Sequence, residues 1–124
     1  MQRWTSQLSL ILEIVYETEH FLSAERVHQI LTQKNANIGI ATVYRNLKKL
    51  VGQGLISEIS WKDMKYYTRH PFSNAFFACE KCGNILRIDI PIADQTYLSN
   101  EIGMSVNKWN MRFEGICEEC GRCT

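Results

Sequence analysis

The sequence predicts an α+β chain in which three short helices and a two-stranded hairpin precede a small α/β domain. Apolar residues recur at helical spacing over residues 5–53 and alternate with polar residues after Gly54. The second half carries two Cys-x-x-Cys pairs among short segments of strand-like composition. A length of 124 residues suits one domain or two small ones. Because Pro71 interrupts the pattern, we expect one domain over residues 1–70 and a second over residues 71–124.

The composition is that of an ordinary globular protein. Apolar residues make up 45% and charged residues 22% of the chain, which excludes a disordered or low-complexity protein. The most apolar stretch, Leu8 to Val15, is far shorter than a membrane-spanning helix, and the first residues lack the pattern of a secretory signal. We therefore expect a cytoplasmic protein without a membrane partner.

Three helices are expected before Gly54. The first begins near Thr5 or Ser6 and ends in the polar residues 17–20, the second is capped by Ser23 and stops near residue 33, and the third spans residues 40–53. Each helix has one apolar face, and these faces consist of Leu8, Ile11, Leu12 and Val15, of Ala24, Val27, Ile30 and Leu31, and of Val43, Leu47, Leu50 and Val51.

A β-hairpin is expected directly after the third helix. Residues 55–61 and 65–68 have the composition of strands, and residues 62–64 form the turn between them. Three helices followed by a hairpin is the element order of a winged helix-turn-helix, whose third helix enters the major groove of DNA. The apolar face of the third helix leaves Thr42, Arg45, Asn46 and Lys49 pointing outward.

The outward side of the third helix and the tip of the hairpin carry side chains that suit DNA. Tyr44 provides an aromatic ring for thymine methyl or sugar contacts, and Arg45 provides a guanidinium for guanine or phosphate. Lysines one turn later and at the hairpin tip suit phosphates. The competing interpretation is an ordinary solvated face. The candidate DNA contacts are Thr42, Tyr44, Arg45, Lys48, Lys49, Lys62 and Lys65.

The charge distribution agrees with a nucleic-acid surface in the N-terminal half. Residues 1–70 carry nine Lys or Arg against six Asp or Glu, whereas residues 71–124 carry five against seven, so the halves have net charges of +3 and −2. Four thiolates on one divalent ion would make the second half more negative still. The positive field then belongs to the N-terminal half.

The five cysteines predict a metal site. Disulfides rarely persist in a reducing compartment, and an odd count leaves one thiol unpaired. Cys79 and Cys82 form one Cys-x-x-Cys pair, and Cys117 and Cys120 form a second after 34 intervening residues. Two such pairs supply the four ligands of a tetrahedral Zn²⁺ ion, which would staple the second domain to the C-terminal residues. The remaining cysteine, Cys123, is expected to be a free thiol.

Two alternatives to zinc remain open at this point. The same sulfur ligands suit iron, and each Cys pair could instead be an independent redox or buried pair. Gly83 and Gly121 favour the metal site, because each directly follows a pair, where the turn often requires a positive φ so that backbone N–H groups face the sulfurs. Around these pairs we expect strands at residues 75–78 and 85–90, a helix over 92–101, and one or two strands within 105–116.

Several segments together resemble the ferric uptake regulator family over nearly the whole chain. Members of that family are metal- or peroxide-responsive transcriptional regulators, typically homodimers with a winged-helix DNA-binding domain and an α/β dimerisation domain. The resemblance implies the same here, with DNA contacts at Tyr44 and Arg45 and structural zinc on the four paired cysteines. The segments are Arg3-Trp-Thr-Ser-Gln7, Ser23-Ala-Glu25, Ile40-Ala-Thr-Val-Tyr-Arg-Asn-Leu47, Gly54-Leu-Ile56, Tyr66-Tyr67, Cys79-x-x-Cys-Gly83 and the second Cys pair.

The sensing metal site of that family lacks its usual ligands in this sequence. The His-rich run before the first Cys pair reads Ser73-Asn-Ala-Phe76, Phe21 stands where relatives often place a histidine, and Arg87 stands where some have a carboxylate. A His pair is also replaced by Lys108-Trp109. We therefore expect the structural metal to be kept and the sensing metal to be lost. The alternative is a shifted second metal site built from His20, His70, Asp89 and Asp94.

The function expected from these observations is a sequence-specific DNA-binding transcriptional regulator, acting as a repressor. It would bind a double-stranded operator as a homodimer, hold one structural Zn²⁺ per chain, and have no small-molecule substrate. The alternatives are a redox-responsive regulator whose zinc thiolates oxidise, and a zinc-stapled adaptor that uses its winged helix for protein contacts. An enzyme is not expected, because the chain has no Gly-rich phosphate loop, no Gly-x-Ser-x-Gly and no His-Glu-x-x-His motif.

Overall fold

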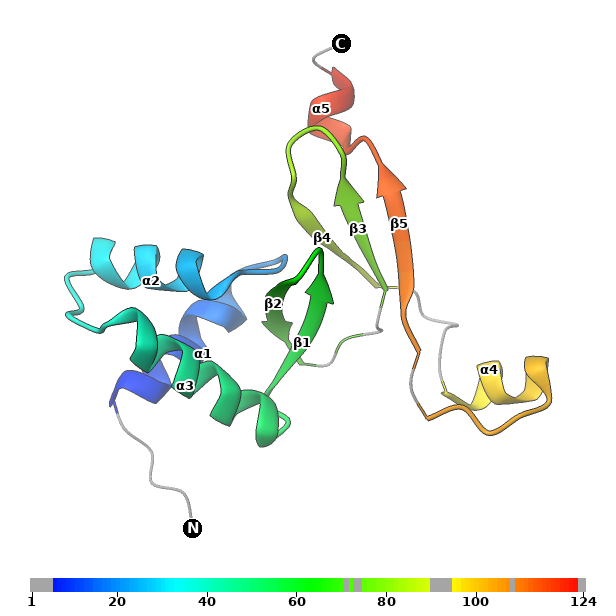
Figure 1. The fold of residues 1–124 in the computed structure, drawn as a ribbon, viewed down its shortest axis with the longest axis horizontal. Helices are drawn as coiled ribbons and strands as arrows, with labels where there is room; N and C mark the ends of the chain where they lie inside the picture. The colour runs from blue at the N-terminus through cyan, green and yellow to red at the C-terminus, as the bar shows by residue number, and fades with distance from the viewer. Residues whose placement is uncertain (1–5, 71, 73–74, 90–94, 108, 123–124) are drawn as a thin grey trace. The chain divides into compact units, whose positions relative to one another are not determined.

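The chain forms two compact units in the computed structural model. The N-terminal unit is Met1–Pro71 and the C-terminal unit is Phe72–Thr124. The structure describes residues 6–70, 72, 75–89, 95–107 and 109–122. Each unit has its own secondary structure, and the two are taken in turn below (Figure 1).

Three helices build the core of the N-terminal unit, namely α1 (Ser6–Glu17), α2 (Ala24–Gln33) and α3 (Ile40–Gly52). Ser23 caps α2 as expected, because its side-chain oxygen accepts a hydrogen bond of 3.1 Å from the backbone N–H of Arg26. The apolar faces of the helices meet in one core that includes Leu8, Ile11, Ile14, Val15, Val27, Leu31, Val43, Leu47 and Leu50.

The structure corrects the expected helix faces at two places. On α1 the buried face includes Ile14, and Leu12 is only half-buried, so the face is rotated from the one that the spacing indicated. On α3 the side chain of Asn46 is buried rather than outward, with 7% of its surface exposed. No fully buried side-chain nitrogen or oxygen in the described part of the chain lacks a hydrogen-bond partner.

The expected hairpin follows α3 as strands β1 (Ile56–Trp61) and β2 (Met64–Arg69). The strands are antiparallel, and Trp61 opposite Met64 is their last pair. Lys62 and Asp63 form the turn with φ of 50° and 64°, so this is a two-residue turn rather than the expected three-residue one. Backbone hydrogen bonds of 2.9 and 2.8 Å between Leu22 and Tyr67 also tie β2 to the segment before α2. This bridge fixes the hairpin against the helices.

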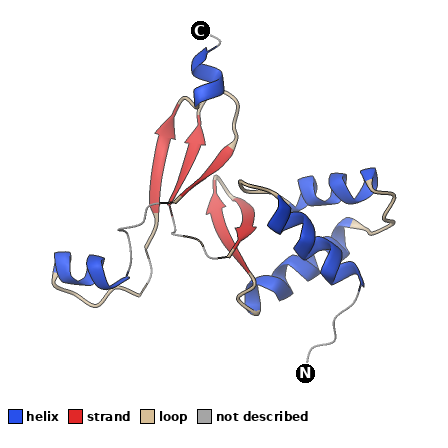
Figure 2. Cartoon of the chain, turned by 180° about the vertical axis from the view of Figure 1, so that it is seen from behind, coloured by secondary structure: helices blue, strands red, loops and turns tan. Residues whose placement is uncertain are grey.

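The C-terminal unit is a three-stranded sheet with two short helices. Its elements are β3 (Ala75–Cys79), β4 (Ile85–Ile88), α4 (Gln95–Ile102), β5 (Met111–Gly115) and α5 (Glu118–Arg122). The strand order is β4-β3-β5, with β3 antiparallel to β4 and parallel to β5. Figure 2 shows β3 between its two neighbours.

Several boundaries in this unit differ from the expected ones. The strand expected at residues 85–90 ends at Ile88, and of the region 105–116, expected to hold one or two strands, the described residues form one strand, β5. The helix expected over residues 92–101 is described from Gln95 onward as α4, and its expected start at Ile92 lies outside the described residues. The helix α5 was not expected, because it has only five residues and these include a cysteine and a glycine. None of the described helices combines the length and the apolar composition that crossing a bilayer requires.

Candidate metal centre and nucleic-acid interface

The sheet of the C-terminal unit brings the two Cys pairs to one edge. Cys79 is the last residue of β3, and Cys117 lies two residues beyond the end of β5. Because β3 and β5 are parallel, their carboxyl ends meet at the same edge of the sheet. Cys82 follows in the turn before β4, and Cys120 lies on α5. The parallel pairing therefore brings cysteines that are distant in sequence close together in space.

The four sulfur atoms have the geometry of a tetrahedral metal site. All four lie within 4.8 Å of one another, and two of the S···S distances are 3.7 Å for Cys79–Cys120 and 3.8 Å for Cys82–Cys117. A Zn–S bond length of about 2.3 Å gives a tetrahedron whose S···S edges are about 3.8 Å. The four side chains are free thiols rather than disulfides. This sulfur set fits a Zn²⁺ ion in both ligand type and spacing.

The local electrostatics of the cluster also favour a cation. The backbone N–H groups of Cys82 and Cys117 each donate to the Cys79 sulfur at 3.4 Å, and they lower the pKa of the Cys79 thiol to about 6. The neighbouring Cys117 sulfur, together with burial, raises the pKa of Cys120 to about 12. Four adjacent thiols cannot all ionise unless a positive charge lies between them. A divalent ion supplies that charge.

The glycine that follows each pair behaves differently. Gly83 has a φ of 77°, and its N–H donates to the Cys79 carbonyl at 3.1 Å, as expected for a tight turn. Gly121 was expected to need the same conformation, and this expectation is wrong. It lies within α5, where its N–H donates to the Cys117 carbonyl at 2.8 Å in an ordinary helical turn. The second pair is thus shaped by a helix. Cys123 lies outside the described residues.

A second metal site from His20, His70, Asp89 and Asp94 stays a prediction. Among the residues that the structure describes, the four cysteines are the one set of three or more ligand-type side chains whose ligand atoms gather. The carboxylate of Asp89 instead accepts a 3.1 Å hydrogen bond from the Nε of Arg87. Asp94 lies outside the described part of the chain.

The candidate DNA contacts on α3 lie on its exposed side. Tyr44, Arg45, Lys48 and Lys49 are exposed, and Thr42 is half-buried. The Arg45 guanidinium donates a 2.9 Å hydrogen bond to the Thr42 hydroxyl one turn earlier. This contact holds the guanidinium along the helix surface, with its other N–H groups available to a further acceptor. The exposed side of α3 therefore carries one aromatic ring and three cations.

Tyr44 has a partner that the sequence did not reveal. Its phenol donates a hydrogen bond to the carboxylate of Glu25, on the first turn of α2. This bond lowers the pKa of Glu25 below its ordinary value of 4.5 and raises the pKa of Tyr44 above its ordinary value of 10.0. Glu25 was part of a family segment, but no periodicity predicts a contact between two helices. Only the packing of α2 against α3 brings the pair together.

The hairpin carries its own polar contacts. At the tip, the Lys62 ammonium lies 5.6 Å from the centroid of the Trp61 ring, a cation–π contact. Further along β2, the Lys65 ammonium lies 3.6 Å from the carboxylate of Glu58 on β1. Both lysines stay exposed. They are placed to meet a polyanion, although Lys65 already has an anionic neighbour.

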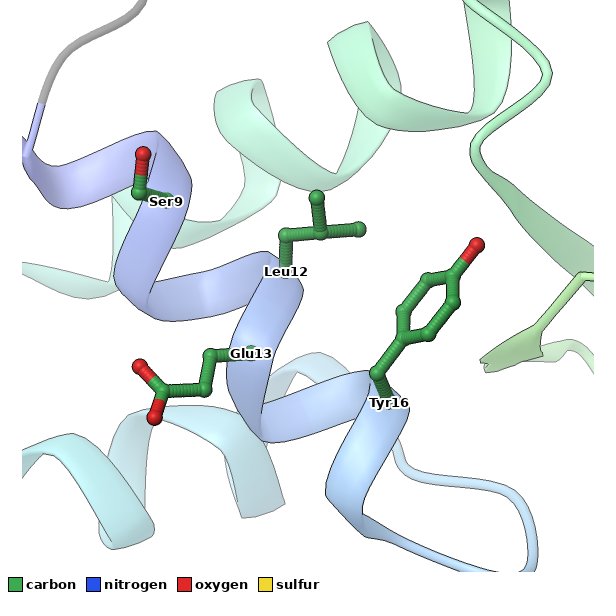
Figure 3. Close-up of a pocket in the computed structure, with 4 residues that line it drawn as sticks. All are labelled: Ser9, Leu12, Glu13 and Tyr16. Carbon is green, nitrogen blue, oxygen red and sulfur yellow. The ribbon is translucent and has the colours of Figure 1, made fainter.

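A shallow groove of about 430 Å³ runs along α1. Figure 3 shows its four lining side chains, Ser9, Leu12, Glu13 and Tyr16, which all come from this helix. The Tyr16 phenol donates to the carbonyl oxygen of Leu55 at 2.7 Å, so its hydroxyl is already engaged. This lining has no paired nucleophile and base, and it suggests no catalytic chemistry.

Comparisons with known proteins agree with this geometry. The profile of the ferric uptake regulator family matches residues 2–114. The chain is 30% identical over 122 residues to a ferric uptake regulation protein of Staphylococcus aureus, covering 95% of this chain and 88% of that protein. It is 28% identical over 123 residues to the peroxide operon regulator of Bacillus subtilis, covering 97% and 85%.

Solved structures share the fold over nearly the whole chain. The ferric uptake regulator of Francisella tularensis, solved with iron, matches with a TM-score of 0.77 at 22% identity, covering 97% of this chain and 95% of that one. The peroxide stress regulator of Campylobacter jejuni matches with a TM-score of 0.73 at 28% identity, covering 92% and 88%. On this family match and these full-length similarities, the chain belongs to the ferric uptake regulator family.

Proposed function

We propose that this protein is a sequence-specific repressor that binds double-stranded DNA as a homodimer and holds one structural Zn²⁺ per chain. Membership of the family makes the chain a DNA-binding transcriptional regulator and not an enzyme. The observation that carries the proposal is the exposed pair Tyr44 and Arg45 on α3, the third helix of a winged helix-turn-helix. We place the protein in the cytoplasm, where its DNA is found.

The two units would have different roles in DNA binding. Residues 1–70 would bind DNA, with Tyr44 and Arg45 at base edges and with Lys48, Lys49, Lys62 and Lys65 at phosphates. Residues 71–124 would form the dimer interface and carry the zinc. A symmetric dimer presents two copies of α3 to successive major grooves, so the operator would be a pseudo-palindrome.

The four paired cysteines would hold the zinc. When bound, the ion supplies a cross-link between the ends of β3 and β5 and a positive charge for the thiolates. Cys79 is best prepared for this role, because two backbone N–H groups already stabilise its charged form. Such a site stabilises the C-terminal unit rather than reporting metal concentration. The same sulfur set suits iron, and elemental analysis of the purified protein separates the two metals.

We further propose that this protein lacks the usual regulatory metal site. Arg87 stands on β4 where some relatives have a carboxylate, and its side chain is only 7% exposed. Its guanidinium pairs with Asp89 and lies 5.6 Å from the centroid of the Phe72 ring. A fixed positive charge in this position disfavours a divalent cation beside it. The protein would then bind DNA without a metal signal.

DNA selection tests the proposed function directly. The zinc-loaded protein is incubated with a random-sequence duplex library, and we expect it to enrich a pseudo-palindromic site. Affinity for that site should fall steeply as salt concentration rises, because lysine–phosphate contacts release counterions. A protein-binding adaptor would enrich no sequence. Failure to enrich any duplex over several rounds would therefore contradict the proposal.

Metal titration tests the loss of the regulatory site. Iron, manganese or zinc is added to the zinc-loaded protein, and binding to the selected duplex is measured. We expect little change in affinity. A gain in the range of about 5- to 150-fold, typical of allosteric coupling, would show that a regulatory site is present.

One observation favours a second candidate, a redox-responsive regulator. Cys82 is exposed and Cys120 is half-buried, so an oxidant can reach two of the four sulfurs. Zinc thiolates can oxidise with loss of the metal. Loss of both zinc and DNA binding in mild peroxide, reversed by a thiol reductant and zinc, would support this candidate. An unchanged zinc content would contradict it.

A further inference from the structure

Two carboxylates lie among the residues proposed to face DNA, where phosphates would repel them. Glu25, at the start of α2, accepts the hydrogen bond from the Tyr44 phenol. Glu58, on β1, lies opposite Tyr67 of β2, and, with burial, its charge raises the pKa of the Tyr67 phenol. An acidic side chain on such a surface weakens binding to any duplex because it repels phosphates. We therefore expect these carboxylates to contribute to DNA recognition in another way.

These two pairs form one connected cluster. Tyr67 is buried, with 3% of its surface exposed, and the carboxylates of Glu58 and Glu25 both raise the pKa of its hydroxyl. The cluster thus joins the start of α2, the exposed side of α3 and the hairpin. The backbone bridge between Leu22 and Tyr67 also ties the segment before α2 to the hairpin. Tyr44 sits at the exposed end of the cluster, with 44% of its surface accessible.

The hydrogen bond to Glu25 determines which part of Tyr44 a ligand can meet. The phenol hydroxyl is its only polar atom, and the carboxylate already uses its proton. The bond also selects one orientation of a ring that would otherwise sample several rotamers. What remains available is the apolar ring itself. Such a ring suits a thymine methyl or a sugar, whereas a free hydroxyl would suit any phosphate oxygen.

We propose that Glu25 is a positioning residue for DNA recognition, which holds the Tyr44 ring so that the ring, and not the hydroxyl, meets the DNA. Glu25 thereby increases specificity at the expense of general affinity. It disfavours every duplex by its charge, and it restores affinity only where the positioned ring finds an apolar base edge. This inference rests on the proposed DNA-binding function and adds a residue outside α3 to it.

The inference predicts a particular pattern among four variants. Glu25→Ala removes the acceptor and Tyr44→Phe removes the donor, so each should lower the ratio of specific to non-specific affinity about fivefold, the value of one positioning hydrogen bond. The double variant should lose no more than either single variant, because both remove the same bond. Glu25→Gln keeps an acceptor without the charge, so it should keep most of the ratio while binding all duplexes more tightly.

The experiment uses the full-length, zinc-loaded protein and the duplex that the wild-type protein selects from a random library. Affinities are measured for that duplex, for a mixed-sequence duplex of the same length, and for the selected duplex with uracil in place of thymine. Wild type should prefer thymine to uracil by about fourfold for each methyl contacted by the ring. Glu25→Ala should lose this preference. Glu13→Ala, which removes an exposed carboxylate from α1, is the matched control for charge.

The outcomes separate this inference from the proposed function. If the wild-type protein selects no duplex, both are overturned. If it selects one, but Glu25→Ala keeps the specificity ratio and the thymine preference, only the positioning role is overturned. Additive losses in the double variant would also overturn it, since the hydroxyl would then contact DNA itself. Thermal unfolding is measured for every variant, and Tyr44→Phe, which keeps the ring, provides the test if Glu25→Ala does not fold.

Discussion

The sulfur atoms of Cys79 and Cys120 lie 3.7 Å apart, although 41 positions separate them in the chain. The contact depends on the parallel pairing of β3 and β5, which brings the residues that follow both strands to one edge of the sheet. The C-terminal unit is small, with three strands of four or five residues each. A sheet of this size buries little apolar surface, so a metal cross-link at its edge contributes a large share of its stability.

Replacing Cys117 by Ser should therefore release the zinc and unfold the C-terminal unit. The loss should be several kcal/mol, because structural zinc sites contribute about 10 kcal/mol or more of apparent binding free energy at neutral pH. Zinc content and thermal unfolding of the purified variant measure this directly. Cys123→Ser makes the same sulfur-to-oxygen change at a cysteine outside the proposed ligand set. If both variants kept a full equivalent of zinc, Cys117 would not be a ligand.

The two glycines that follow the Cys pairs should respond oppositely to alanine. Gly83→Ala places a side chain at a φ of 77°, which costs about 1 kcal/mol even though no atom lies within 4 Å of the new Cβ. Gly121→Ala should be neutral or stabilising, because Gly121 is helical and its Cβ would also meet nothing within 4 Å. Chemical denaturation of the zinc-loaded variants checks the signs. Equal effects would contradict the helical assignment of Gly121.

Replacing Arg45 by Ala should weaken specific DNA binding by about 1–3 kcal/mol if its guanidinium reads a base. The affinity for mixed-sequence DNA should fall much less, so the specificity ratio should drop. Binding titrations at several salt concentrations give both quantities. Lys34→Ala removes an exposed cation at the end of α2 and is the matched control. A uniform loss across all sequences would instead make Arg45 a phosphate contact.

Tyr67 should make the N-terminal unit sensitive to high pH. Burial and the nearby Glu58 carboxylate raise the pKa of Tyr67 from 10.0 to about 12. The unfolded chain therefore loses this proton first, so the stabilisation is complete below about pH 10 and is lost as the pH rises toward 12. Denaturant unfolding between those limits should show a steeper decline for wild type than for Tyr67→Phe. Parallel declines would mean that the phenol is not protected.

The local elements could be read from the sequence because each depends on neighbours in the chain. The helices α1, α2 and α3, the Ser23 cap and the hairpin all followed from spacing and capping residues. The sequence also carried the four-cysteine pattern and the family resemblance. It did not reveal the burial of Asn46, because the helical spacing alone placed this residue on the outward side of α3.

The sequence alone determined which residue types were available, namely two Cys pairs for a tetrahedral ion and an aromatic–arginine pair on the third helix. Their spacing was enough, because a Cys-x-x-Cys turn and a helical face are local properties. Tertiary structure decided that β3 and β5 are parallel and that Glu25 meets Tyr44. Each of these contacts joins segments whose separation carries no periodic signal, so only the packed core determines it.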